Sequence, residues 1–265
     1  MAKLSAPRRP VGRIVRGCGQ GSRRLRRVMI LLLALAPAAW AATAAAPITL
    51  RFSDTAPGSA LPEGWKVYAV SRHRPAARMT LVLDGGGTVF HIDADHAAGA
   101  VAHVLDLPAT TTLGWRWKVD HSVAAANLAR KKGDDFAARV YVFFDVPHSS
   151  LSWLQRMKLK LASRTLGHAM PTAALCYVWD NRHPIGTIAS SPYSPQVRTI
   201  VLQSGNAHAG SWQVQERDLA ADFLAAFGRP VPRITGIALS ADTDNTGGHV
   251  QAWFGDVTLA PAVTE

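Results

Sequence analysis

Short segments in which apolar and polar residues alternate dominate the chain from Pro47 onward. An alternation of period two places neighbouring side chains on opposite faces of an extended strand, so each segment predicts a strand with one buried face. Gly, Pro, Asp and Asn residues separate the segments and favour the turns that join antiparallel strands. The predicted strands, apart from the hairpin described next, are 48–53, 65–70, 99–106, 113–120, 136–145, 173–180, 197–203, 211–217, 234–241 and 250–259.

The clearest hairpin is "RMTLVLDGGGTVFHID", residues 78–93. The residues from Asp84 to Gly87 lie in its middle and tolerate positive φ angles, which allows the flanking strands to pair antiparallel. So many short strands predict an all-β protein with two packed antiparallel sheets, a β-sandwich.

Two segments have helical spacing instead. Residues 150–167 place apolar side chains on one helical face between a candidate cap, Ser150, and a terminal Gly167. Residues 217–228 predict a shorter helix that ends at Gly228. One or two helices of this size are expected at the periphery of the sandwich. No internal repeat or low-complexity linker interrupts residues 47–265, which we interpret as a single domain.

Basic residues are concentrated at the N-terminus. The formal net charge of +11 would suit a protein that binds nucleic acid or an anionic membrane. Residues 1–46, however, hold nine Lys or Arg residues and no acidic residue, which leaves 20 basic against 18 acidic residues in the rest of the chain. The charge therefore belongs to a presequence, and we expect no nucleic acid partner.

Residues 1–46 have the parts of a secretory signal peptide. An arginine-rich region precedes the apolar run "VMILLLALA", residues 28–36, and alanines at 42–46 offer cleavage sites of the A-x-A type. The run is shorter than the roughly 18 residues of a spanning helix, so we expect a periplasmic or otherwise exported protein without an integral membrane span. An uncleaved anchor that extends through the alanines is the alternative. The twin arginines of "SRRLRRV" leave the export route open.

Cysteine usage agrees with this interpretation. Cys18 lies in the presequence, so Cys176 has no partner for an internal disulfide in the predicted mature chain. Cys176 lies in the apolar segment "AALCYVWD", where we expect a buried and unreactive thiol.

The common catalytic and cofactor motifs are absent from the sequence: G-x-S-x-G, a Walker loop, G-x-G-x-x-G, H-E-x-x-H and C-x-x-C. We therefore assign no catalytic residue, no cofactor and no metal ion. "HIDADH" places His91, Asp93 and Asp95 on one face of a strand, where they would either ligate a metal or face solvent. Their spacing favours the solvated face.

A tryptophan-rich strand allows two interpretations. In "GWRWKVD", residues 114–120, Trp115 and Trp117 share one face, while Arg116 and Lys118 share the other. In the first interpretation the tryptophans are buried in the core and the charges face solvent. In the second, the rings lie on a concave sheet face where they stack on sugars.

The segment "FAARVYVFFD", residues 136–145, contains an arginine among apolar residues. Alternation directs Arg139 away from the principal core face, together with Tyr141. A buried guanidinium needs a carboxylate partner, and Asp134 and Asp135 stand just before the strand. These residues form either a structural ion pair or the floor of a ligand groove, and we favour the groove by a small margin.

The loop "DTDNTGG", residues 242–248, presents oxygen side chains at alternate positions, Asp242, Asp244 and Thr246. This arrangement is similar to the first half of an EF-hand calcium loop. The twelfth position is Trp253 instead of a bidentate glutamate. A turn held by Asx hydrogen bonds is therefore favoured over a calcium site.

Several of these segments resemble the pattern of the bacterial domain-of-unknown-function family 3047. They are "GDDFAARVYVFFD", "LCYVWDNRHPIGT", "ALSADTDNTGG", "LPEGWKVY" and "LGWRWKVD", and the resemblance covers residues 52–257. It implies an exported protein with a jelly-roll type of β-sandwich and no established activity. With Trp117 and Tyr141 added, the motifs mark these positions for ligand binding: Asp134, Asp135, Arg139, Tyr177, Trp179, Asn181, Asp242, Asp244 and Asn245.

Three functions remain open. By analogy with other sandwiches, the first is a periplasmic glycan-binding protein, in which Trp117, Tyr177 and Trp179 stack on sugars and Arg139 and Asn181 recognise polar groups. The second is a polysaccharide lyase or hydrolase of the same architecture. It would need a base near a neutralising cation, for which Tyr177, His183 and Arg139 are candidates.

The third function is a non-catalytic envelope assembly protein. The helix predicted for residues 150–167 has four basic side chains and no acid, and it could rest on an anionic membrane surface. Those side chains are Arg156, Lys158, Lys160 and Arg164. They are not confined to one side of the helix, so a solvated helix is the favoured interpretation.

We predict that the mature protein begins between about Ala42 and Pro47, because the apolar run before these residues is too short to span a membrane. The intact mass of protein recovered from the periplasmic fraction of an expressing bacterium checks the cleavage. Retention of residues 1–46 in protein recovered from the membrane fraction would contradict it.

Overall fold

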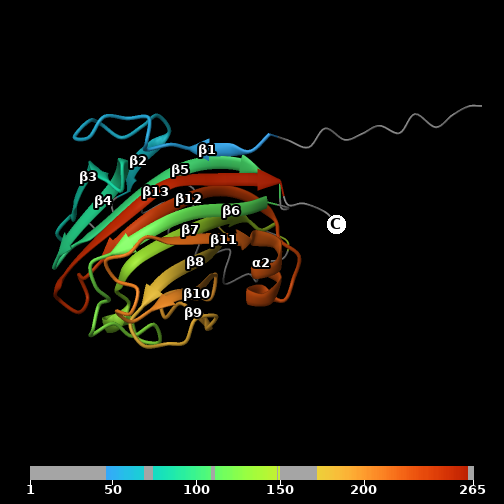
Figure 1. Cartoon of the computed structure of the whole chain (residues 1–265). Coiled ribbons are helices and arrows are strands. Elements are labelled where there is room, and N and C mark those ends of the chain that lie inside the picture. Colours follow the sequence, from blue (N-terminus) through green and yellow to red (C-terminus); the bar gives the residue numbers. More distant parts are fainter. Residues whose placement is uncertain (1–45, 69–73, 109–110, 148, 150–171, 262–265) are drawn as a thin grey trace, which may run out of the picture. The chain divides into compact units, whose positions relative to one another are not determined.

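The computed structural model of the protein describes residues 46–68, 74–108, 111–147, 149 and 172–261. These residues form two β-sheets, here named sheet A and sheet B, with a hydrophobic core to which strands of both contribute (Figure 1). The predicted β-sandwich of jelly-roll type is confirmed. None of the helices in this part of the chain has the length and apolar character needed to cross a bilayer.

Sheet A has six strands. Its order is β11-β6-β13-β4-β3, and β1 pairs with β13 beside that path. All of its pairings are antiparallel. The strands are β1 Ile48–Leu50, β3 Arg78–Asp84, β4 Gly87–Asp95, β6 Thr111–Val119, β11 Gln213–Asp218 and β13 His249–Pro261.

Sheet B has seven strands in the order β2-β5-β12-β7-β8-β10-β9. The strands are β2 Trp65–Tyr68, β5 Ala98–Leu107, β7 Phe136–Asp145, β8 Ala173–Asp180, β9 Ile188–Ser190, β10 Val197–Ser204 and β12 Arg233–Asp242. One pairing differs from the predicted antiparallel pattern, because β10 inserts between β8 and β9 and runs parallel to β8.

Alternation located these strands well. Two of them, β7 and β8, have the predicted bounds, and the others differ by a few residues at their ends. The sequence analysis missed β9, which has three residues and is too short to show a period of two. The predicted hairpin is confirmed, with Gly85 and Gly86 at φ angles of 63° and 83° in the two-residue turn between β3 and β4.

The shorter predicted helix is α2, Leu219–Phe227. The Asp218 carboxylate accepts hydrogen bonds from the first free amides of the helix, and Gly228 ends it in the left-handed conformation, with a φ angle of 67°. Phe223 packs against Phe144 of sheet B, with ring centroids 4.8 Å apart. The helix predicted for residues 150–167 lies outside the described residues.

Three connections between the sheets come together at one end of the strands. They join β4 to β5, β6 to β7 and β12 to β13. The first and third are hydrogen-bonded to each other, because the Thr243 amide donates to the Ala97 carbonyl at 2.9 Å and the His96 amide donates to the Gly248 carbonyl at 2.7 Å. Loops that cross between the sheets have backbone N–H and C=O groups without partners in a strand. The structure of this end of the molecule therefore depends on polar contacts that satisfy these groups.

We predict that Cys176 is unreactive in the folded protein. Its side chain is buried, and burial raises the pKa of the thiol to about 12, so the reactive thiolate is scarce at pH 8. In a Cys18→Ser variant, which retains one cysteine, a thiol reagent should label the chain slowly in buffer and rapidly in guanidinium chloride. Fast stoichiometric labelling of the folded protein would contradict this placement.

Candidate functional site

Two gatherings of polar side chains in the described part of the chain bear on a functional site. The first place, here named the Arg139 cluster, lies where the three inter-sheet connections meet. It contains Asp134, Asp135, Arg139, Tyr141, Asp242, Asp244 and Asn245. The second is a groove on the face of sheet A that points away from the core. Most of the predicted polar binding residues lie in the first place, whereas the predicted aromatic residues Trp117 and Trp179 contact each other in the core, with ring centroids 6.0 Å apart.

Arg139 lies on the face of β7 that points away from the main core, as alternation predicts. The alternation itself is interrupted, because a register shift between β7 and β12 leaves both Ala137 and Ala138 in the main core. Phe136 therefore lies on the same side as Arg139, although strict alternation would place it on the core face. The guanidinium carbon is 4.5 Å from the centroid of the Phe136 ring.

All three nitrogens of the Arg139 guanidinium are engaged within the protein. Nε donates to Asp242 at 3.1 Å, and Nη2 donates to the other oxygen of the same carboxylate. Nη2 also donates to the Asp134 carbonyl at 2.5 Å, while Nη1 donates to the Tyr141 hydroxyl at 3.0 Å and lies 3.6 Å from the Asp134 carboxylate. The residue is 5% exposed and each of its nitrogens has an acceptor within the protein, which indicates a structural role.

The pairing determines the charges at this cluster. Burial alone would lower the pKa of Arg139, but the neighbouring Asp242, Tyr141 and Asp134 raise it well above its usual range. Burial raises the pKa of Asp242 to about 7, against the opposing effect of Arg139. Arg139 therefore stays charged, and its charge is what makes a buried carboxylate at Asp242 tolerable.

Asp135 holds the loop between β12 and β13. The side chain is fully buried, and its two oxygens accept hydrogen bonds from the backbone amides of Asn245 and Thr246 and from both of their side chains. The loop "DTDNTGG" is thus a hydrogen-bonded turn, but the predicted Asx hydrogen bonds are wrong, because the acceptor is a carboxylate from the β6–β7 connection and not a side chain of the loop itself. Asp244 at the same loop lies 3.5 Å from the guanidinium of Arg74.

The carboxylates of Asp135, Asp242 and Asp244 lie close enough to hold a metal ion, since their oxygens are within 4.8 Å of one another. Each of them already has a donor: Asp242 has Arg139, Asp244 has Arg74 and Asp135 has the loop amides. A hard cation would have to displace these donors to gain its oxygen ligands. We therefore assign no metal to the cluster.

The aromatic rings predicted to stack on sugars are in the core, which corrects the sequence analysis. Trp117, Tyr177 and Trp179 are at most 1% exposed. The Tyr177 hydroxyl donates to Asp222 of α2 at 2.7 Å, and the Trp179 indole donates to the Gly205 carbonyl at 3.0 Å. The rings pack between the sheets because alternation places them on the inner faces of β6 and β8.

Asn181 is also separate from the Arg139 cluster. Its amide donates to the carbonyls of Ala124 and Ala126 in the β6–β7 connection, at 2.8 and 3.1 Å. The candidate base His183 is tied to Asp180, whose carboxylate accepts from the His183 ring at 2.8 Å. Tyr177 and His183, the two candidates for a base beside Arg139, are thus bonded to the carboxylates of Asp222 and Asp180. Neither of these carboxylates belongs to the Arg139 cluster.

The residues of "HIDADH" lie on β4 and each finds a different neighbour. His91 contacts Gln251 at 3.0 Å, Asp93 contacts His249 at 2.6 Å and Asp95 contacts His96 at 2.8 Å. The hydrogen bond to Asp93 raises the pKa of His249. No shared ligand centre links the three predicted positions.

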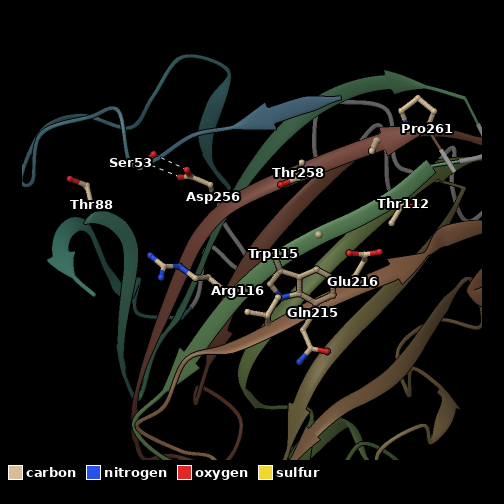
Figure 2. A pocket seen from close by; sticks show the side chains of 13 residues that line it. Ser53, Thr88, Thr112, Trp115, Arg116, Gln215, Glu216, Asp256, Thr258 and Pro261 are labelled. Atoms are coloured by element: carbon tan, nitrogen blue, oxygen red, sulfur yellow. Dashed lines mark hydrogen bonds between the residues drawn. The ribbon is translucent and has the colours of Figure 1, made fainter. Parts of the chain in front are cut away.

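The groove on sheet A has a volume of about 610 Å³ and is open to solvent. Figure 2 shows its polar side chains rising from β6, β11 and β13, with Thr88 and Ser53 on one side. The chemical groups are hydroxyls, an amide, carboxylates and one guanidinium. The residues that carry them are Ser53, Thr88, Thr112, Arg116, Gln215, Glu216, Asp256 and Thr258.

Asp256 fixes the rim of the groove. It lies at a register shift between Phe254 and Val257, where β13 bulges relative to β6. One carboxylate oxygen accepts from the amides of Phe52 and Ser53 at 2.7 and 3.0 Å, and the other accepts from the Ser53 hydroxyl at 2.7 Å (Figure 2). Both oxygens are thus used to hold the segment after β1.

Beside the groove, cationic and aromatic side chains alternate across the outer face of sheet A. The guanidinium carbon of Arg116 lies 4.5 Å from the Trp212 ring centroid, and Lys118 lies 5.3 Å from it. Lys118 also lies 4.5 Å from the Trp253 ring, and Trp253 stacks on His91 at 4.8 Å. Contacts of this kind orient the cations while keeping their polar edges accessible.

The sequence analysis did not select this face. It placed Arg116 and Lys118 correctly on the outer side of β6 and interpreted them as solvated charges. Trp212 comes from the connection before β11, so its contact with Arg116 is not visible in the pattern of either strand. A signal existed in "WFGD", where the glycine inside a strand marks the bulge that exposes Asp256.

We predict that Arg139→Met lowers the free energy of unfolding by about 3–5 kcal/mol, because it leaves the buried Asp242 carboxylate without its partner. Urea unfolding at pH 7 measures the difference. Arg116→Met is the matched control. It removes a partly exposed cation–π contact worth roughly 0.5–1 kcal/mol. Equal stabilities of the Arg139→Met variant and the unsubstituted protein would contradict a structural role for the cluster.

Three comparisons with known proteins extend these observations. A family described as "Protein of unknown function (DUF3047)" matches residues 63–258. No curated protein matches the chain. Among solved structures, a family 12 xyloglucanase from Bacillus licheniformis is similar at 7% identity and a TM-score of 0.42, covering 82% of this chain and 99% of that one.

Two further structures show similar levels of likeness. A family 30 carbohydrate-binding module has 10% identity and a TM-score of 0.36, covering 82% of this chain and 99% of its own. The glycoside hydrolase domain of Endo-D from Streptococcus pneumoniae has 13% identity and a TM-score of 0.34, and the match covers 76% of this chain but 22% of that one. We transfer no activity from these likenesses. The family match extends over most of the two sheets, and the chain therefore belongs to the DUF3047 family of proteins of unknown function.

Proposed function

We propose that the protein is an exported, non-catalytic glycan-binding protein whose ligand lies in the groove over β6, β11 and β13. The observation that carries the proposal is the groove itself, an open depression in which hydrogen-bonding side chains are set among a largely apolar surface. Its volume of about 610 Å³ falls within the roughly 300–1,000 Å³ of small-molecule sites. The signal peptide predicted for residues 1–46 supports the exported location.

The chemistry of the lining suits a ligand with many hydroxyl groups. Thr112, Thr258 and Ser53 offer hydroxyls, Glu216 offers a carboxylate, and Arg116 offers a guanidinium. Such groups donate and accept hydrogen bonds along an extended chain of sugars. The groove runs over the sheet instead of closing around a point, which suits a polymer segment more than a compact metabolite.

Binding is favoured over hydrolysis by the state of the carboxylates. Hydrolysis of a glycosidic bond normally uses two carboxyl groups, one on each side of the bond. The groove contains Glu216 and Asp256, and both oxygens of Asp256 accept hydrogen bonds from Phe52 and Ser53. Asp256 therefore already holds the segment after β1 in place, which favours a structural role for it over a catalytic one.

The other two hypotheses have less support. A lyase would need its base and cation together, whereas Arg139, Tyr177 and His183 contact different carboxylates. The basic helix on which the assembly hypothesis depends lies in residues 150–167, outside the described part of the chain.

We expect the full chain, produced by export, to bind members of a polysaccharide-fragment array, and Gly114→Leu to weaken that binding at least tenfold, about 1.4 kcal/mol. Gly114 lies on the groove floor, where an added Cβ would meet only ordinary contacts, with the Thr258 Cβ at 3.8 Å. A leucine there fits the strand but occupies the space of the ligand.

Thr80→Leu is the matched control. Thr80 lies on β3 of the same sheet, where it pairs with His91 of β4, and it does not line the groove. The glycan affinity of the Thr80→Leu variant should equal that of the unsubstituted protein. Absence of binding to every glycan on the array would contradict the proposed function, and binding that Gly114→Leu leaves unchanged would contradict the groove as its location.

A further inference from the structure

We infer that the groove selects acidic glycans, and that Arg116 binds the carboxylate of a uronic acid residue in the ligand. This inference rests on the proposed glycan-binding function and adds the substrate class to it. Its basis is one cation that lines the groove without a hydrogen-bonded acceptor or a close ion pair in the described residues, held in place by neighbours on two sides.

Arg116 is unusual among the cations near the groove because its only charged neighbour of opposite sign in the described residues, Asp84, acts on it at a distance and is itself paired with Lys118. Within the described residues, no carboxylate oxygen lies within 4 Å of its guanidinium nitrogens, and no acceptor makes a hydrogen bond to it. Lys118, two residues further along β6, is instead paired with Asp84. The free cationic donors in the groove are therefore those of Arg116.

The Arg116 side chain is held by packing. Figure 2 shows it running across β13 toward the side of the groove where Thr88 lies. A Cβ atom placed on Gly255 would come within 2.7 Å of its Cγ and Nε, so the stem lies directly on that glycine. The guanidinium stacks on the Trp212 ring, and the Trp212 indole is fixed by a 3.2 Å hydrogen bond to Asp84.

This arrangement suits a planar anion. Stacking uses the face of a guanidinium and leaves its N–H edges free, and two parallel N–H groups match the two oxygens of a carboxylate. Holding the side chain in advance reduces the entropy lost when the ligand binds. A sugar hydroxyl could also accept from Arg116, but it would use one donor and leave the charge unmatched.

The single unbonded carboxylate of the groove gives the ligand a direction. Glu216 pairs with Gly114 and Val214 pairs with Arg116, so Glu216 lies two residues further along the sheet from Arg116. A carboxylate of the ligand is favoured at the Arg116 end and disfavoured near Glu216, which can accept hydrogen bonds from sugar hydroxyls. A glycan with spaced acid groups fits this pattern better than a uniformly charged one.

The test uses matched pairs of oligosaccharides from the array, each uronate-containing oligosaccharide together with its methyl ester. Esterification removes the charge and keeps the sugar chain. Calorimetry with the full chain should show at least tenfold weaker binding of the ester than of the acid. Arg116→Met should bring the affinity for the acid down to that for the ester and leave the affinity for the ester within about twofold.

Two further variants separate a positioned guanidinium from general electrostatic attraction. Gly255→Ala keeps every charge and pushes Arg116 aside, and it should also weaken binding of the acid selectively. Arg78→Met removes an exposed arginine from β3, outside the groove, and should change nothing.

The outcomes distinguish the two proposals. Equal affinity of the unsubstituted protein for acid and ester, or an equal loss for both in Arg116→Met, would overturn the acidic specificity and leave glycan binding standing. An equal effect of Arg78→Met and Arg116→Met would also overturn the role of Arg116. Failure to bind any oligosaccharide, charged or neutral, would overturn the glycan-binding function itself.

Discussion

The end of the sandwich where three inter-sheet connections meet depends on the burial of one guanidinium, that of Arg139. Its two hydrogen bonds to Asp242 join the start of β7 to the end of β12. The adjacent Asp135 carboxylate accepts hydrogen bonds from the backbone amides of the loop that crosses from β12 to β13. A charge buried in this way is tolerated when its donors are satisfied, and all three nitrogens of Arg139 are. The Arg139 cluster therefore stabilises the fold by holding these strands and connections together.

Because the Arg139 cluster lies at one end of the strands, the outer face of sheet A remains available for ligand binding. The strands of sheet A reach across the molecule from the fixed end, and their outer side chains carry the groove and the cation–aromatic row beside it. The two arginines illustrate the division. Arg139 is surrounded by acceptors within the protein, whereas Arg116 is stacked on an indole and has no carboxylate partner in the described residues. Burial and pairing, more than residue type, separate a structural arginine from a binding one.

The fold followed from the sequence because alternation is a local property, and β7 and β8 appear at their predicted residues. That Arg139 would have a carboxylate partner was also foreseeable, since a buried arginine requires acids, but the sequence pattern did not select Asp242 of β12 over Asp135. The groove was not foreseeable. Trp212 and Arg116 come from different elements, and the exposure of Asp256 depends on a bulge between β13 and β6. Alternation shows only which residues share a face of a strand. Whether the face of Trp117, Tyr177 and Trp179 is buried between the sheets or exposed depends on how the sheets pack, and in the structure it is buried.

A crystal structure of the protein with an acidic oligosaccharide bound would test most directly whether Arg139 is structural and Arg116 binds the ligand. We expect the sugar over β6 and β13, with a carboxylate within hydrogen-bond distance of the Arg116 guanidinium and the contacts of Arg139 unchanged. A sugar bound instead against Asp134 and Tyr141, with Arg139 turned away from Asp242 toward the ligand, would contradict the account.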